Sequence, residues 1–157
     1  MSTRSSIILK VRKEDIGKKV KFDQSKLTLI GWGANDLYSY GDESGEEKSE
    51  EVTINSEYIG VYCHYDGEPN GIGRILKEQF SDYDKLLNLL IGGDISFICE
   101  NGVRHYANRK GESWEWNKPK QKGTAAGIAN HFGENSFIFK DGKWLFKYVG
   151  QKAYKKF

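Results

Sequence analysis

The fold is decided by the stretch Tyr58-Ile59-Gly60-Val61-Tyr62-Cys63-His64-Tyr65, which we interpret as a β-strand within a β-like segment at 52–65. Side chains of a strand alternate between its two faces. The more apolar face, which we expect to be core, carries Ile59, Val61, Cys63 and Tyr65. The other face carries Tyr58, Gly60, Tyr62 and His64. Because neighbouring side chains diverge, Cys63 and His64 are not expected to form a nucleophile–base pair, and Cys63 is predicted to be a core thiol.

Two helices are predicted directly after this strand. A turn by composition comes first, at residues 66–71. The first helix is indicated by apolar residues at helical spacing, namely Ile72, Ile75, Leu76 and Phe80. Ser81 and Asp84 form a capping box for the second helix, and Gly92-Gly93 ends it. Its apolar stripe consists of Tyr83, Leu86, Leu87, Leu90 and Ile91.

Shorter segments complete an α+β fold. Strands are expected at residues 4–11, 18–22, 26–31, 95–99 and 103–106, and a short helix at 124–132. Asp141-Gly142 lies between two apolar runs and predicts a β-hairpin with a type I′ turn. We therefore expect a mainly antiparallel sheet with the two consecutive helices packed on one face.

Length and charge suggest one domain with an acidic loop. The chain has 157 residues, which indicates a single domain at 1–157. Residues 33–51 are rich in Gly, Ser, Asp and Glu and predict a mobile surface loop. Residues 42–51 hold six acidic residues against one lysine, a net charge of −5, whereas the whole chain carries +2. The basic remainder suits an anionic ligand, although a solvated lysine-rich surface explains the same charges.

Cysteine and histidine usage indicates a cytoplasmic protein without metal or cofactor. The two cysteines, Cys63 and Cys99, have no disulfide or zinc-finger spacing, so we expect reduced thiols. The first residues lack an apolar signal region, and no apolar run is long enough to cross a bilayer. His64, His105 and His131 are far apart in sequence, and a pair of His64 with Asp66 is insufficient for a metal.

The strand–turn–helix at 58–80 is the strongest candidate for a binding site. Gly71-Ile72-Gly73 opens a helix directly after a strand, where unpaired N–H groups carry the positive end of the helix dipole. Glycines let an anion approach this backbone, and Arg74 adds charge-assisted hydrogen bonds. The alternative is a turn that merely needs glycine dihedral angles, because a short Gly-x-Gly motif is a weak signal.

Aromatic and charged residues extend this candidate site. His64 and Asp66 flank the turn, and Tyr62 shares the face of His64, so these groups suit a nucleobase or a purely structural role. Arg109, held by Glu112, suits a phosphate, or forms a surface ion pair of little energetic weight. Trp114 and Trp116 alternate in a polar stretch, which predicts either stacking on bases or an edge strand.

Several motifs resemble those of a group of small phage and mobile-element proteins. The matching segments are Ser2-Thr3-Arg4-Ser5-x-Ile7, Val61-Tyr62-Cys63-His64-Tyr65-Asp66-Gly67-x-Pro69-x-Gly71-Ile72-Gly73, Gly93-Asp94-Ile95-Ser96 and Phe139-Lys140-Asp141-Gly142-Lys143-Trp144. A segment at 106–112 is similar too, with departures at Ala107 and Asn108, while Tyr65 and Glu68 replace a usual Trp and Tyr. Residues 12–57 look like an insertion relative to shorter members. The resemblance implies a phage-type accessory protein, and such proteins often serve counter-defence.

We therefore hypothesise a non-enzymatic accessory protein of the host-cell cytosol that sequesters a nucleotide-derived small molecule. The predicted ligand-binding residues are Arg4, Tyr62, His64, Asp66, Gly71, Gly73, Arg74 and Arg109. One alternative is an inhibitor that binds a host nuclease or defence protein directly, with the loop at 42–51 mimicking phosphates. Another is a small nucleotide-processing hydrolase that uses His64 and Asp66, or Glu112, for acid–base chemistry. The aromatic content is compatible with a homo-oligomer.

Overall fold

The computed structural model describes residues 4–27, 48–99, 102–109 and 111–157. The loop predicted at 33–51 and the strand predicted at 26–31 fall largely outside these ranges. The strand predicted at 18–22 is shorter, with β2 at Lys19–Val20. It pairs antiparallel with β3 at Val52–Thr53 in a separate two-stranded sheet.

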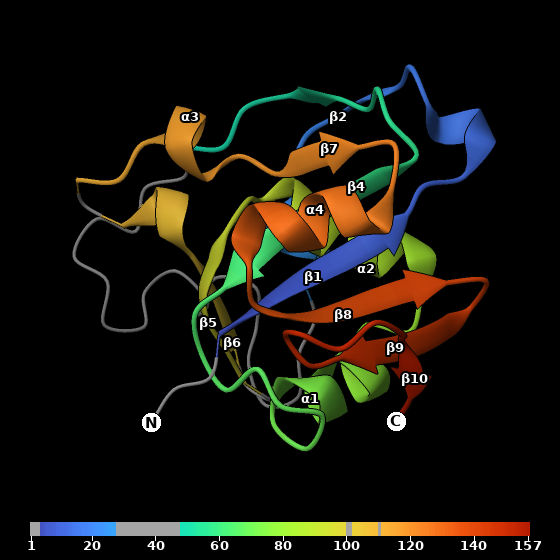
Figure 1. Ribbon diagram of the computed structural model, residues 1–157. Coiled ribbons are helices and arrows are strands. Elements are labelled where there is room, and N and C mark those ends of the chain that lie inside the picture. Colours follow the sequence, from blue (N-terminus) through green and yellow to red (C-terminus); the bar gives the residue numbers. More distant parts are fainter. Residues whose placement is uncertain (1–3, 28–47, 100–101, 110) are drawn as a thin grey trace.

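An eight-stranded sheet forms the centre of the fold (Figure 1). Its strands are β1 Ser5–Lys10, β4 Tyr58–Cys63, β5 Ile95–Cys99, β6 Gly102–His105, β7 Lys120–Lys122, β8 Asn135–Lys140, β9 Lys143–Lys147 and β10 Lys155–Lys156. The order is β10-β9-β8-β1-β4-β5-β6, and β7 also pairs with β4. The pairs β1/β8 and β4/β5 are parallel and the others antiparallel, which confirms the predicted mainly antiparallel sheet.

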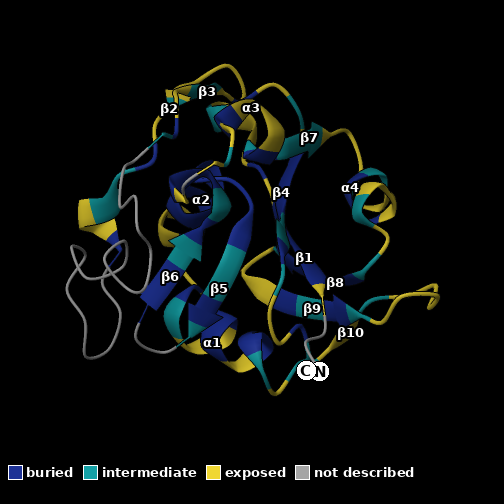
Figure 2. Cartoon of the chain, turned by 90° about the vertical axis from the view of Figure 1, so that its left-hand side faces the viewer, coloured by how far each residue is buried: buried dark blue, intermediate teal, exposed yellow. Residues whose placement is uncertain are grey.

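Helices cover both faces of this sheet. The predicted consecutive helices, α1 Ile72–Gln79 and α2 Tyr83–Ile91, pack on one face, as expected. The third predicted helix, α4 Ala125–Phe132, lies on the opposite face, and Figure 2 shows α2 and α4 on either side of β1 and β4. No described helix is long and apolar enough to span a membrane. The α+β class is therefore confirmed, and the third predicted helix covers the far face of the sheet.

The two faces of β4 follow the predicted alternation. Ile59, Val61 and Cys63 are fully buried in the larger core beneath α1 and α2. Burial raises the pKa of the Cys63 thiol to about 12, as expected of a core thiol. Tyr65 is 43% exposed, contrary to the predicted core face, because β4 already ends at Cys63. On the other face, Tyr58 joins a smaller core beneath α4.

The structure shows the cap of α2 and the turn between β8 and β9 in detail. Asp82, not Ser81, caps α2, because its carboxylate accepts the Lys85 N–H at 3.0 Å while the Ser81 hydroxyl donates to the Lys77 carbonyl. Between β8 and β9, Asp141 and Gly142 both have positive φ, at 54° and 74°. This pair confirms the predicted type I′ hairpin.

Candidate ligand-binding site

The sheet forks along one edge of β4. Strand β7 pairs with residues 58–60 of β4, and β5 takes over at Cys63. Figure 1 shows β7 and β5 lying well apart. Between them, the Tyr62 N–H donates to the Asp94 carboxylate at 3.0 Å. A side chain therefore replaces a neighbouring strand at this point, and it closes the ladder where two strands diverge.

The loop after α2 holds Asp94 in place through its backbone. The Asp94 N–H donates to the Asn117 carbonyl at 2.8 Å, and its carbonyl accepts the Tyr106 N–H at 2.9 Å. Gly93 has φ of 90°, and a Cβ there would lie 2.4 Å from the Asn117 oxygen. The Gly93-Asp94 pair within the motif at 93–96 thus has a structural reason: only glycine permits this approach.

Asp94 is a buried carboxyl group with incomplete solvation. Its relative exposure is 8%. Burial raises its pKa to about 7, while the Tyr62 N–H and the positive charge of Lys120 act in the opposite direction. The group therefore exchanges its proton near neutral pH, which is typical of functional carboxyls as well as of strained structural ones.

A cavity of about 370 Å³ opens beside Asp94. Its walls come from β4, β7, the short helix α3 Trp114–Asn117 and the end of α4. The lining residues are Tyr62, Asp94, Glu115, Trp116, Lys120, His131 and Phe132. This volume is in the range of small-molecule sites.

Helix α3 places its two tryptophans in opposite environments. The Ser113 hydroxyl caps it by accepting the Trp116 N–H at 3.2 Å, so the segment is a helix rather than the edge strand considered above. Trp114 is 8% exposed and packs near Gly93, whereas Trp116 is 78% exposed at the cavity. An indole face at a cavity rim is a surface on which planar ligands stack.

An aromatic cluster continues from the cavity along the α4 face. The Tyr62 hydroxyl and His64 Nδ1 form a hydrogen bond of 2.7 Å. The Tyr62 ring lies 6.4 Å from that of Tyr106 and 6.1 Å from that of Phe132. Burial raises the pKa of Tyr62 to about 12, so its hydroxyl stays protonated. This arrangement leaves the histidine tethered beside the cavity wall.

Two predicted arginines lie around this cluster. The Arg109 guanidinium carbon is 5.6 Å from the centre of the Tyr106 ring, a cation–π arrangement. Arg4 is exposed just before β1, and its charge favours ionisation of Tyr62. The structure thus brings Arg4, Tyr62, His64 and Arg109 to one region.

The predicted anion site at the start of α1 has a different geometry. The Gly71 and Gly73 N–H groups donate to the Glu68 carbonyl, Ile72 N–H to the Asp66 carbonyl, and Arg74 N–H to the Gly71 carbonyl. A Cβ at Gly71 would meet Asp66 at 2.5 Å. The four N–H groups already have partners, so this geometry favours the alternative interpretation of a turn that needs glycine. Ligand binding here stays a prediction.

The other predicted residues of this group are exposed. Asp66 has φ of 55° and accepts two N–H bonds on its carbonyl, from Glu68 and Ile72. Arg74 lies 3.5 Å from the Glu78 carboxylate along α1. Because α1 and α4 cover opposite faces, Gly71, Gly73 and Arg74 do not join the cavity beside Asp94.

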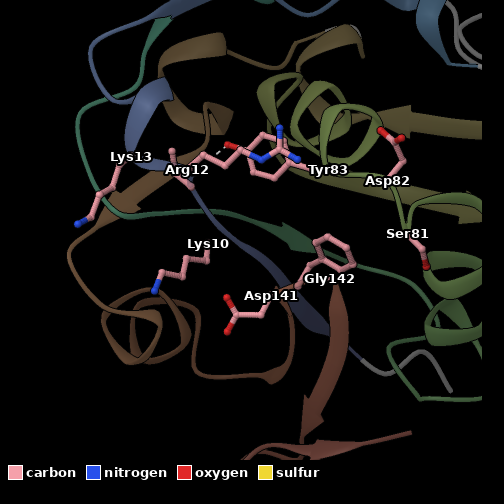
Figure 3. Close-up of a pocket in the computed structure, with 10 residues that line it drawn as sticks. Lys10, Arg12, Lys13, Ser81, Asp82, Tyr83, Asp141 and Gly142 are labelled. Carbon is pink, nitrogen blue, oxygen red and sulfur yellow. Dashed lines mark hydrogen bonds between the residues drawn. The ribbon is translucent and has the colours of Figure 1, made fainter.

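A second cavity, of about 500 Å³, lies at the far end of β1 (Figure 3). The Arg12 guanidinium sits over the Tyr83 ring at 4.0 Å. The Tyr83 hydroxyl donates to the Asp15 carboxylate at 2.7 Å and accepts a hydrogen bond from the backbone N–H of Arg12 at 3.0 Å. Figure 3 also shows Lys10 and Asp141 in this groove. Its charged groups are exposed and of both signs, so we favour the cavity that contains a buried carboxyl.

Comparison with known protein families, curated proteins and solved structures finds no match. Within the described ranges, no group of three or more His, Cys, Asp or Glu residues is placed to hold a metal ion. Sequence reasoning missed Asp94, Glu115, Lys120, His131 and Phe132 as members of the site. Only Asp94 carried a signal, its place in the motif at 93–96.

Proposed function

We propose that the chain binds a small molecule containing a nucleobase in the cavity beside Asp94. The observation that carries the proposal is a buried carboxyl group on the wall of a cavity otherwise lined largely by aromatic rings. Burying a charge without full compensation is unfavourable, so a ligand that donates hydrogen bonds to this carboxyl group would be bound favourably. Nucleobases combine a flat face for stacking with an edge of hydrogen-bonding groups.

The remaining lining residues support the same class of ligand. Trp116 offers an exposed indole face, and Tyr62 and Phe132 add rings on the sheet side. Stacking of a base on an aromatic side chain contributes about 1–3 kcal/mol. Lys120 supplies a positive charge at the same cavity for a phosphate group.

Binding without chemistry is the simpler function for this site. Cys63, which follows Tyr62 in sequence, is fully buried on the other face of β4, and its pKa of about 12 keeps it protonated. A second candidate function is hydrolysis of a nucleotide with Asp94 as the general base, because its pKa of about 7 suits proton transfer at neutral pH. Release of a product from a bound nucleotide distinguishes the two functions.

The biological role that we propose is sequestration of a nucleotide signal by a cytosolic accessory protein of a phage or mobile element. The motif resemblance and the base-sized cavity support it. Inhibition of a host nuclease through the loop at 42–51 remains the rival proposal. Binding of a small nucleotide by the protein alone supports the first role, and capture of a host defence protein supports the second.

The direct test is calorimetric titration of the protein with nucleoside monophosphates and cyclic oligonucleotides. We expect Trp116→Ala to weaken binding at least about tenfold, since a stacking partner is lost. Val149→Ala is the matched control, because Val149 is also exposed, at 61%, and does not line the cavity. Absence of binding across the panel, or equal affinities for both variants, would refute the proposed function.

A further inference from the structure

We propose that Asp94 makes the cavity selective for a base that presents two adjacent N–H donors, as guanine does on its N1 and N2 edge. This inference rests on the proposed function and specifies the ligand class of the same site. An ionised carboxylate only accepts hydrogen bonds, and its two oxygens match two parallel donors. Adenine presents a ring-nitrogen acceptor on the corresponding edge. The lone pair of that nitrogen would face the lone pairs of the carboxylate, which is unfavourable.

Asp94 lines the cavity and has acceptor capacity beyond its bond to Tyr62. The part of the chain that the structure describes gives its carboxylate one hydrogen bond, from the Tyr62 N–H at 3.0 Å. A carboxylate offers about four lone-pair directions. Asp94 is more than nine-tenths buried and lines the cavity, so a ligand in the cavity can reach its carboxylate. Two donors from a base would restore the solvation that folding removed.

Charged and titratable groups from each neighbouring element affect the ionisation of the Asp94 carboxyl group. Lys120 on β7 favours its ionised form, while Tyr106 and Cys63 interact with the same charge. Glu115 and His131 line the cavity as well, and Glu115 is held by Lys118 at 2.7 Å. Asp94 is therefore the acidic group of the cavity without a paired cation at contact distance among the described residues.

Selective binding of guanine should be coupled to the release of a proton from Asp94. The pKa of Asp94 is about 7, so much of the free protein holds a protonated carboxyl at neutral pH. Guanine requires the ionised form, so binding releases a proton. The affinity for guanosine monophosphate should rise about tenfold between pH 6 and pH 8, in proportion to the ionised fraction. A base that accepts from protonated Asp94 would show the opposite slope.

The test is calorimetry of the wild-type protein with guanosine, inosine and adenosine monophosphates at pH 6 and pH 8. Inosine keeps the N1–H donor and lacks the N2 amino group, so we expect the affinity order guanosine, inosine, adenosine. Titrations in two buffers of different ionisation enthalpy should reveal proton release with the guanosine ligand at neutral pH. Equal affinities for the three bases, or affinity that falls as pH rises, would overturn the inference while leaving base binding intact.

Asp94→Asn provides an independent readout. The asparagine oxygen keeps the Tyr62 N–H partner and its amide adds a donor, so xanthosine monophosphate, with N1–H beside a carbonyl, should replace guanosine as the preferred ligand. Unchanged guanosine preference in this variant would overturn the inference. Should the variant fail to fold, the base series and the pH slope of the wild type still decide. Failure of every nucleotide to bind would instead remove the proposed function together with this inference.

Discussion

Strand β4 separates two regions of different character, an apolar core on one face and a cavity that contains a buried carboxyl group on the other. Beneath α1 and α2, Ile59, Val61 and Cys63 are fully buried among apolar side chains. On the α4 face, the same strand carries Tyr62, which is half-buried and hydrogen-bonded through its N–H to a buried carboxylate. The first region is complete in the folded chain. The second contains a buried carboxyl group beside a cavity, and this difference is the reason that we propose a binding site on the α4 face.

The largest expected effect is a loss of stability when a side chain of the main core is truncated. Truncation to alanine should have different consequences in the two regions. Ile59→Ala should lower the free energy of unfolding by about 2–5 kcal/mol, because it leaves a cavity in the main core. Trp116→Ala should leave stability within about 0.5 kcal/mol of wild type, since the side chain is 78% exposed, and should weaken ligand binding. Urea unfolding combined with calorimetry measures both quantities. A larger loss of stability for Trp116→Ala than for Ile59→Ala would contradict the contrast between the two regions.

Asp94→Asn should increase stability at alkaline pH. The wild-type carboxyl has a pKa of about 7 when folded against 3.8 unfolded, so the stability of the protein falls as pH rises from about 4 to 7. Asparagine keeps an acceptor for the Tyr62 N–H without carrying charge. The variant should therefore match wild type near pH 4 and exceed it by roughly 2–4 kcal/mol at pH 8.

Urea unfolding at the two pH values tests this prediction. Glu115→Gln, at an exposed position of the same cavity, should show no such gain. A loss of stability of Asp94→Asn at pH 8 would mean that the ionised carboxylate is part of the structural framework rather than a cost borne for binding.

His105 should produce the opposite pH dependence within the main core. It is fully buried, its Nε2 lies 2.9 Å from the Leu89 carbonyl, and its ring lies 4.8 Å from that of Phe22. Burial lowers its pKa from 6.5 to about 4, so the folded protein holds it neutral. Stability from this group is complete above pH 6.5 and is lost as pH falls toward 4, by about 3 kcal/mol.

The measurement is the pH dependence of unfolding of Asp94→Asn, in which the opposing contribution is absent, compared with the same variant carrying His105→Gln. The double variant should lose much of the acid-side slope. NMR of the His105 ring should show a neutral imidazole down to about pH 4. A ring that titrates near 6.5 would contradict the burial argument.

Local patterns predicted most elements, whereas the site depended on contacts between distant segments. Alternation at 58–65 and helical spacing at 72–91 are properties of consecutive residues, so the strand and both helices were predictable. The cavity exists because β7 and β5 diverge along β4, which brings Asp94 and Lys120 beside Tyr62 from far along the chain. No local signal reports such a fork. Glycines after a strand were equally ambiguous, because anion loops and tight packing both require them.

Gly73 gives the smallest expected effect and resolves that ambiguity. A Cβ there would lie 2.9 Å from the rings of Phe137 and Phe157, so Gly73→Ala should cost about 1–3 kcal/mol through overpacking. Gly123→Ala is the matched control, because its Cβ would have no neighbour within 4 Å. Both variants should keep wild-type affinity per folded molecule, since the start of α1 faces the main core rather than the cavity beside Asp94. Reduced nucleotide affinity in a folded Gly73→Ala protein would indicate that the ligand binds at the start of α1. It would thereby contradict the contrast that we draw between the two faces of β4.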